Sequence, residues 1–302
     1  MGKIAFVFSG QGDQFPGMGK DLQQQYPAAA EVFALCDRLR PGTSAQCFGG
    51  SEEELKETKN TQPCLFAMEL AAATVLTEAG IRPDAVAGFS LGEVVAAAFA
   101  GLTDRETGFS LVCRRGELMQ EAAEQYDTSM AAVVKLTNER VEELCSAYSQ
   151  VYPVNFNCPG QVSVAGLSEQ MTPFASDVKA AGGRAIPLKV KGAFHSPFMT
   201  DAAAAFAEKL SEVRFEKGNI TLYSDVTAQP YAENAAELLA RQICSPVQWE
   251  RIIRNMIAEG VDTFIEIGPG KTLTNMIGKI DPTVKRYAVA ELATLLTEVA
   301  PC

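Results

Sequence analysis

The part of the chain best suited to chemistry is the pentapeptide Gly88-Phe-Ser-Leu-Gly92, which has Ser90 at its centre. The apolar run 85–87 before it predicts a buried strand, and the Ala-rich run 91–100 after it predicts a helix. Two glycines permit a tight turn between these elements, and such a strand-turn-helix lifts a serine hydroxyl out at the strand end as a nucleophile. A glycine- and serine-containing turn before a helix is also common without catalysis, so the motif alone leaves a purely structural turn open.

Two backbone segments could stabilise an oxyanion near this serine. The N–H of Leu91 would lie at the start of the predicted helix, where backbone donors face an anion. A glycine-rich loop, Ser9 to Gln14, follows a predicted strand at 3–8. It could cradle phosphates, but it lacks the Lys-Ser/Thr of a P-loop and the third glycine of a dinucleotide site. A backbone-lined anion or oxyanion loop is the better interpretation.

The chain contains a single histidine, His195. A serine nucleophile needs a base at neutral pH, and imidazole is the side chain with the appropriate intrinsic pKa. If Ser90 is catalytic, the pairing with His195 is therefore forced. A lone histidine is more often a surface or core residue. Its place beside a Ser-Pro turn, where a small domain is expected to return to a large one, favours a cleft.

Two neighbouring arginines differ in the helical face they occupy. A capping-box pattern at Thr103–Glu106 predicts a helix that runs to about residue 125. Arg114 falls on its charged stripe, whereas Arg115 shares the apolar face with Leu111 and Leu118. A buried guanidinium needs an anionic partner. That partner is either an internal carboxylate or the carboxylate of a substrate, which Arg115 would bind in bidentate fashion.

Composition narrows the class of protein. The 302 residues suffice for one large core or two domains, and the net charge of −11 argues against nucleic acid and anionic membranes as partners. No apolar run reaches the roughly 18 residues of a membrane span. The N-terminal run resembles the first strand of a cytoplasmic protein. The eight cysteines include no C-x-x-C pair, so the sequence indicates neither a zinc site nor a disulfide framework.

The order of predicted elements indicates an α/β protein with a mainly parallel sheet covered on both faces. Between 128 and 196 the order becomes βαββαβ, the ferredoxin-like unit. This predicts a small domain, 128–196, inserted into a large catalytic domain made of 1–127 and 197–302. The strands expected in the insertion are 130–136, 152–156, 161–165 and 184–190, and its helices are 138–148 and 168–181. In the large domain we expect strands at 3–8, 85–87, 220–224 and 263–267, and helices at 16–26, 28–39, 52–57, 64–79, 235–243, 247–259 and 271–280.

Eight short motifs, taken in order along the chain, resemble the malonyl-coenzyme A:acyl carrier protein transacylase family over nearly its whole length. The resemblance implies a hydrolase-like parallel sheet with a ferredoxin-like insertion, and ping-pong transfer through an acyl-serine. The motifs are Phe8-Ser-Gly-Gln-Gly-Asp-Gln14, Thr61-Gln-Pro63, Gly88-Phe-Ser-Leu-Gly-Glu93, Arg115-Gly-x-x-Met-Gln120, Val154-Asn-Phe-Asn-x-Pro-Gly-Gln161, Phe194-His-Ser196, Pro246-Val-Gln-Trp249 and Glu266-Ile-Gly-Pro-Gly-Lys271.

The family's functional residues carry over onto matching positions of this chain. The resemblance implies Ser90 as nucleophile, His195 as base and Arg115 as the binder of the substrate carboxylate. It also implies oxyanion N–H groups at Gln11 and Leu91, and a main-chain carbonyl at Gln242 that holds the histidine. An amide carbonyl can fix the imidazole tautomer without placing a second negative charge beside the substrate carboxylate.

One position departs from the family. A histidine usually precedes the nucleophile, and here the residue is Phe89, which removes a polar contact near the acyl group. Phe194, before His195, is expected to fill the space that an α-methyl group would need, and it favours malonyl over methylmalonyl.

We therefore expect a malonyltransferase of fatty acid biosynthesis that takes malonyl-CoA and an acyl carrier protein as partners, uses no metal or redox cofactor, and is a cytoplasmic monomer. Alternatives are a trans-acting malonyl acyltransferase of a polyketide synthase, an inactive scaffold, and a serine esterase or thioesterase. The last is disfavoured because such hydrolases generally orient their histidine with a carboxylate and need no buried arginine.

Overall fold

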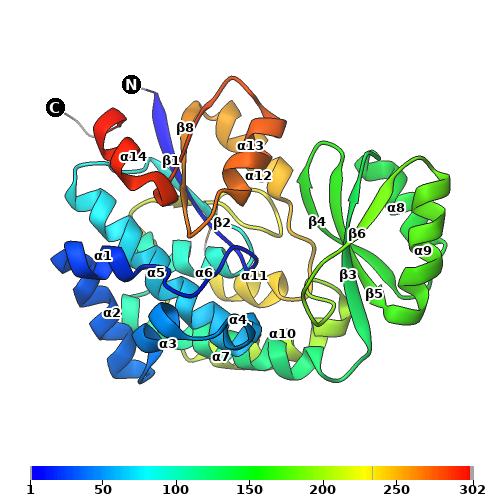
Figure 1. The fold of residues 1–302 in the computed structure, drawn as a ribbon, viewed down its shortest axis with the longest axis horizontal. Coiled ribbons are helices and arrows are strands. Elements are labelled where there is room, and N and C mark those ends of the chain that lie inside the picture. Colours follow the sequence, from blue (N-terminus) through cyan, green and yellow to red (C-terminus); the bar gives the residue numbers. More distant parts are fainter. Residues whose placement is uncertain (1, 233, 300–302) are drawn as a thin grey trace.

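The computed structural model describes residues 2–232 and 234–299, whose elements form two separate sheets. The larger sheet has the strand order β7-β2-β1-β8-β9, and its paired strands all run parallel. In Figure 1 helices cover both faces of this sheet, and the smaller sheet lies to one side of it. The predicted α/β architecture with a mainly parallel sheet is confirmed. The strands are β1 (Lys3–Phe8), β2 (Ala85–Gly88), β7 (Thr221–Leu222), β8 (Val261–Ile267) and β9 (Lys285–Ala288).

Strand β1 lies at the centre because its sequence is almost wholly apolar. Residues 5–8 are completely buried, as expected for a strand with helices on both faces. Its register with β2 pairs Phe8 with Gly88, so both strands end at the same edge. The carboxyl ends of parallel strands are where open α/β sheets bind ligands. The loop after β1 and the turn after β2 therefore meet where a site is expected.

The smaller sheet is antiparallel and has the order β4-β5-β3-β6. Its elements follow the predicted sequence βαββαβ, and Thr137 caps α8 as expected by accepting a hydrogen bond from the backbone N–H of Arg140. A separate apolar cluster that includes Val133, Val162 and Phe174 lies within it. The domain limits of 128 and 196 stay a prediction. The elements are β3 (Thr128–Val134), α8 (Asn138–Ser146), β4 (Val151–Cys158), β5 (Gln161–Leu167), α9 (Ser168–Ala180) and β6 (Arg184–Pro187).

Helix α5 (Thr58–Glu78) begins six residues before the predicted start at Cys64. Pro63 was expected to open the helix because it lacks an N–H, but it lies inside the helix. Thr58 and residues 61–63 of this extension are buried, and Thr61 anchors it by donating from Oγ1 to the carbonyl of Leu55 at 2.5 Å. Tertiary contacts thus outweigh the helix-breaking tendency of the proline.

Helix α7 (Arg105–Ala123) begins one residue later than the predicted capping box implies. Its N-cap is Asp104, not Thr103, because the Asp104 carboxylate accepts a hydrogen bond from the backbone N–H of Thr107 at 2.7 Å. The turn α3 (Thr43–Gly49), strand β9 and helix α14 (Leu292–Glu298) were not predicted, and β6 ends three residues early. The other helices are α1 (Lys20–Gln25), α2 (Pro27–Leu39), α4 (Glu52–Lys56), α6 (Leu91–Phe99), α10 (Thr200–Ser211), α11 (Ala235–Gln242), α12 (Trp249–Ala258) and α13 (Thr272–Ile280), with short 3₁₀ turns at Pro197–Met199 and Val289–Glu291.

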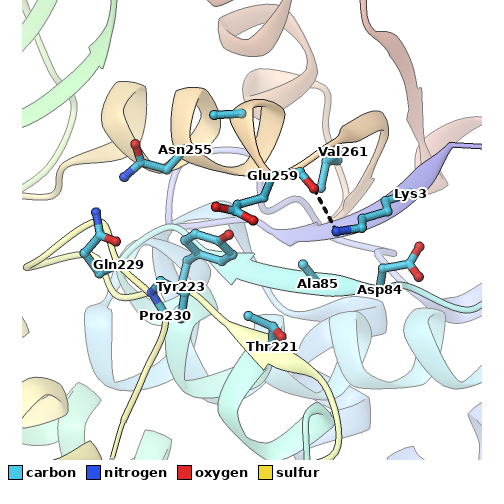
Figure 2. A pocket seen from close by; sticks show the side chains of 11 residues that line it. Lys3, Asp84, Ala85, Thr221, Tyr223, Gln229, Pro230, Asn255, Glu259 and Val261 are labelled. Atoms are coloured by element: carbon cyan, nitrogen blue, oxygen red, sulfur yellow. Dashed lines mark hydrogen bonds between the residues drawn. The ribbon is translucent and has the colours of Figure 1, made fainter.

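A cavity of about 540 Å³ opens at the opposite edge of the large sheet, where β1 and β8 begin (Figure 2). Its wall includes Lys3, Asp84, Tyr223 and Glu259, and Lys3 Nζ donates to the Glu259 carbonyl at 2.7 Å. None of the residues singled out in the sequence lines it. Within the described residues, no helix has the length and apolar character needed to cross a membrane.

Candidate active site

Ser90 lies at the turn between β2 and α6, in a backbone conformation that non-glycine residues rarely adopt. Its φ of 58° and ψ of −108° cost on the order of 1–3 kcal/mol and persist only where the surroundings enforce them. A Cβ on Gly88 would fall 1.9 Å from the backbone of Gly92, and one on Gly92 would fall 2.3 Å from the carbonyl oxygen of Phe8. Both glycines are therefore required by close backbone approach, and the strand-turn-helix predicted around Ser90 is confirmed.

His195 meets Ser90 from the segment that returns from the small sheet. Its Nε2 lies 2.7 Å from Ser90 Oγ, and its Nδ1 lies 2.8 Å from the main-chain oxygen of Gln242. Since a carbonyl can only accept, Nδ1 carries the proton and Nε2 is left to accept from the serine hydroxyl. The structure thus brings together the nucleophile, the base and the histidine-holding carbonyl that were expected from the sequence.

The imidazole is uncharged at neutral pH. Burial is the largest cause that lowers the pKa of His195, and the positive charge of Arg115 is the second; hydrogen bonds with Gln242 and Ser245 act in the opposite direction, and the pKa lies at about 4. A general base must be unprotonated to accept a proton. This site therefore keeps its base ready over the whole physiological range.

Arg115 is completely buried and directs its donors at the nucleophile. Its Nη1 donates to Gln62 Oε1 at 2.9 Å, and its Nη2 donates to Gln242 Oε1 at 2.5 Å and to Ser90 Oγ at 3.3 Å. These recorded partners are two amides and a hydroxyl. Burial lowers the pKa of Arg115 to about 10, with Glu93 and Asp225 opposing the shift, so the guanidinium stays charged.

Arg114 behaves as its place on the other face predicts. Its Nη1 lies 3.1 Å from a carboxylate oxygen of Glu117, and both side chains are exposed. The two adjacent arginines therefore lie in different environments, with Arg115 buried and Arg114 partly exposed.

The two predicted oxyanion residues belong to neighbouring segments. Leu91 is the first residue of α6, and Gln11 lies in the loop after β1, where its Oε1 accepts from Gln62 Nε2 at 3.2 Å. The backbone N–H of Phe89 donates to the Phe8 carbonyl at 2.9 Å, which joins this loop to the turn at Ser90. The role of their N–H groups stays a prediction.

A cleft of about 830 Å³ lies between α4, α7 and the loop after β6, beside these residues. Gln11 and Phe194 form part of its wall, and exposed Lys189 and Lys191 lie along it. Phe89 packs edge-to-face on Trp249 with the ring centroids 5.5 Å apart. An aromatic contact thus occupies the place where the family usually has a histidine.

Sequence reasoning missed two buried carboxylates behind the serine. Asp225 Oδ2 accepts from the Ser90 backbone N–H at 2.8 Å, and Glu93 Oε1 accepts from the Asp225 N–H at 3.0 Å. Burial raises the pKa of both, that of Glu93 to about 7. Two signals could have found them. Glu93 is a lone charge in an apolar helix, and Asp225 follows β7, the strand that pairs with β2.

Comparison with known proteins agrees with this geometry. A family model described as an acyl transferase domain matches residues 5–298. The malonyl CoA-acyl carrier protein transacylase of Bacillus subtilis is 39% identical over 304 residues, covering 98% of this chain and 96% of that protein. The structure of the transacylase of the same name from Clostridium perfringens has a TM-score of 0.95 at 35% identity, with 98% and 97% of the chains covered. A malonyl-transacylase solved with a type II polyketide acyl carrier protein has a TM-score of 0.93 at 37% identity, with 98% of both chains covered.

The lowered pKa of His195 predicts how the reactivity of Ser90 depends on pH. A fluorophosphonate reagent has no titrating group, so its rate of reaction with Ser90, followed by intact mass, reports the base alone. We expect this rate to halve near pH 4, far below the 6.5 of a free imidazole. Arg115→Met should move the half-point to higher pH, because removing the positive charge makes the imidazolium less unfavourable. A half-point near 6.5 in the folded wild-type protein would contradict the assignment.

Proposed function

The chain belongs to the acyl transferase family, and we propose that it moves a malonyl group from coenzyme A to the phosphopantetheine thiol of an acyl carrier protein through an ester on Ser90. The observation that carries the proposal is that one hydroxyl, Ser90 Oγ, lies within hydrogen-bonding distance of both His195 Nε2 and Arg115 Nη2. A base activates the nucleophile, and a fixed cation beside it can select an acyl group that bears a carboxylate.

The first half-reaction acylates the enzyme. Ser90 Oγ attacks the thioester carbon of malonyl-CoA while His195 Nε2 takes the hydroxyl proton. The negative charge of the tetrahedral intermediate would be stabilised by the N–H groups of Gln11 and Leu91. The C–S bond then breaks, and His195 returns the proton to the departing thiol. In the second half-reaction the carrier thiol attacks the ester by the same route in reverse, and Ser90 regains its proton.

The role proposed for Arg115 follows from what it contacts. Its recorded hydrogen bonds go to neutral oxygens, and its buried Nε has no partner among the described residues. A malonyl carboxylate entering the site would give the guanidinium the anion that its burial calls for. The carbonyl of Gln242 orients His195 without adding a negative charge next to the imidazole.

Hydrolysis is the less favoured chemistry, because the imidazole is oriented by a main-chain carbonyl and a buried arginine faces the nucleophile. A polyketide carrier in place of a fatty-acid carrier is the second candidate. It is supported by the similarity to a malonyl-transacylase solved with a type II polyketide acyl carrier protein. The proposed steps need neither a metal nor a redox cofactor. The cytoplasmic location and the monomeric state remain predictions.

Intact-mass analysis after incubation with malonyl-CoA tests the proposal. The wild-type protein should gain one malonyl group, and Ser90→Ala should gain none because its methyl group cannot form the ester. His195→Ala should slow acylation by roughly 10²-fold or more. Incubation with acetyl-CoA and methylmalonyl-CoA compares the acyl groups in the same assay. A malonyl adduct that persists in Ser90→Ala would place the nucleophile elsewhere.

Arg115 separates a malonyltransferase from a hydrolase. A charge-assisted hydrogen-bonded pair contributes about 1.5–3 kcal/mol, or roughly tenfold to a few hundredfold in preference for a carboxylated acyl group. Arg115→Ala should lose malonyl transfer by that factor and keep or gain acetyl transfer. Arg115→Lys should rescue only in part, because it lacks the planar fork. Arg114→Ala is the matched control from the exposed face and should behave like wild type. Equal losses for both acyl groups would make Arg115 structural.

Docking of an acidic carrier to an acidic chain needs local positive charge. The sequence offers four candidates near the return segment and Gln242, namely Lys189, Lys191, Arg251 and Arg254. Lys189 and Lys191 line the cleft, whereas Arg251 does not and Arg254 is paired with Glu250 at 2.7 Å. The double variant Lys189→Glu/Lys191→Glu should raise the KM for the carrier roughly tenfold and leave acylation by malonyl-CoA nearly unchanged. The control is Lys217→Glu/Lys285→Glu, which changes the same charge at exposed positions outside the cleft. Equal losses in both half-reactions would contradict the assignment.

A further inference from the structure

Asp225 lies directly behind the nucleophile and is completely buried. It follows β7, at the carboxyl end of the strand that pairs with β2. One of its oxygens, Oδ2, accepts two hydrogen bonds, from the Ser90 backbone N–H at 2.8 Å and from Gln242 Nε2 at 3.2 Å. The carboxylate thus contacts both the backbone of the nucleophile and the residue whose carbonyl holds His195.

The bond to Ser90 acts on a strained part of the backbone. The Ser90 nitrogen forms the N–Cα bond whose φ angle of 58° turns the serine outward. Its hydrogen-bond acceptor, Asp225, is 135 residues further along the chain. A hydrogen bond at this N–H fixes the peptide plane between Phe89 and Ser90, and with it the direction in which the serine side chain leaves the backbone. The acceptor for this N–H thus comes from a distant part of the chain and not from the turn itself.

The bond to Gln242 determines which way its amide faces. The Nε2 group donates to both Asp225 Oδ2 and the main-chain oxygen of Ser90, so Oε1 is turned toward Arg115 Nη2 at 2.5 Å. With the amide reversed, an N–H group would face the guanidinium donors, and an oxygen would face the carboxylate. Asp225 and the Ser90 carbonyl therefore together keep an acceptor turned toward Arg115.

Asp225 is itself held from two sides. Its N–H donates to Glu93 Oε1 at 3.0 Å, and that oxygen also accepts from Tyr231 Oη at 2.6 Å. Its carbonyl accepts from the N–H of Gln248 at 2.9 Å. Because Glu93 lies in the first turn of α6, the network closes back on the helix that Ser90 begins.

We propose that Asp225 is a positioning residue, which holds Ser90 in its strained conformation and orients the Gln242 amide toward Arg115 by accepting both N–H groups on one oxygen. The inference rests on the proposed acyl-serine chemistry, but it concerns the geometry of Ser90, which can be measured without any malonyl substrate.

The test compares Asp225→Ala with Asp225→Asn in the full-length protein. Asp225 Oδ1 has no hydrogen-bond partner among the residues that the structure describes. Asparagine can therefore keep its oxygen on both N–H groups and place its amide nitrogen where Oδ1 lies. The readout is the rate of phosphonylation of Ser90 by a fluorophosphonate, followed by intact mass. In this reaction the Oγ–P bond forms, the P–F bond breaks with release of fluoride, and His195 takes the hydroxyl proton.

Asp225→Ala should slow phosphonylation per folded molecule by roughly 10²-fold, the effect of a misplacement of about 1 Å. Asparagine should recover at least tenfold of that loss. The preference for malonyl over acetyl should also fall in Asp225→Ala, because the Gln242 amide loses one of the two acceptors that orient it. If Asp225→Ala does not fold, Asp225→Ser replaces it, since its hydroxyl is too short to reach both N–H groups.

The matched control is Asp37→Ala. Asp37 also accepts from a backbone N–H, that of Ser44 at 2.9 Å, and from the same residue's hydroxyl, in the α2–α3 region. The control should lower the thermal midpoint and leave the phosphonylation rate per folded molecule unchanged. A wild-type rate in Asp225→Ala, or an Asn variant no faster than the Ala variant, would overturn the proposal. If the wild-type protein transfers no malonyl but Ser90 responds as stated, only the proposed function fails.

Discussion

Everything in the site depends on Ser90 being held in a conformation that its own backbone disfavours. The turn projects the hydroxyl toward His195 and Arg115, but a positive φ at a non-glycine residue persists only when its surroundings enforce it. Two kinds of constraint do so here. Gly88 and Gly92 let three backbone segments approach more closely than any side chain would permit. Hydrogen bonds from the far half of the chain then fix both sides of the serine peptide, at its N–H and at its carbonyl.

The charges of the site are arranged so that the cation stays available. Arg115 is buried beside the serine and bonds two amides, whereas the buried carboxylates Asp225 and Glu93 bond backbone N–H groups and a tyrosine. They support the charge of the guanidinium through space without occupying its donors. The same positive charge, together with burial, lowers the pKa of His195 and keeps it unprotonated. Under the proposed function, one buried arginine would both select an anionic acyl group and help to keep the histidine unprotonated.

The inserted sheet matters because of where its chain returns. His195 lies eight residues after the end of β6, the last strand of the smaller sheet, and the hydrogen bond between its backbone N–H and the Ile243 carbonyl joins that return segment to the residue after Gln242. An isolated bridge joins Asn155 of β4 to Val247, in the segment between α11 and α12. The base is thus held between the two parts of the molecule, and the cleft beside it is lined by residues from both. The exposed side chains of Lys189 and Lys191, in the return segment, line this cleft.

The sequence alone determined the α/β class, the βαββαβ insertion, the nucleophile turn and the contrast between Arg114 and Arg115, because each follows from local periodicity or from close backbone approach. Because the chain has a single histidine, the sequence also identified His195 as the partner of Ser90, on the condition that Ser90 is catalytic. Only the tertiary structure decided what surrounds these residues. Helix α5 extends past Pro63 and α7 is capped by Asp104, since packing and side-chain geometry outweigh local propensity. Asp225 lies beside Ser90 because β7 pairs with β2. The two residues are 135 positions apart, so no local sequence pattern could predict their contact.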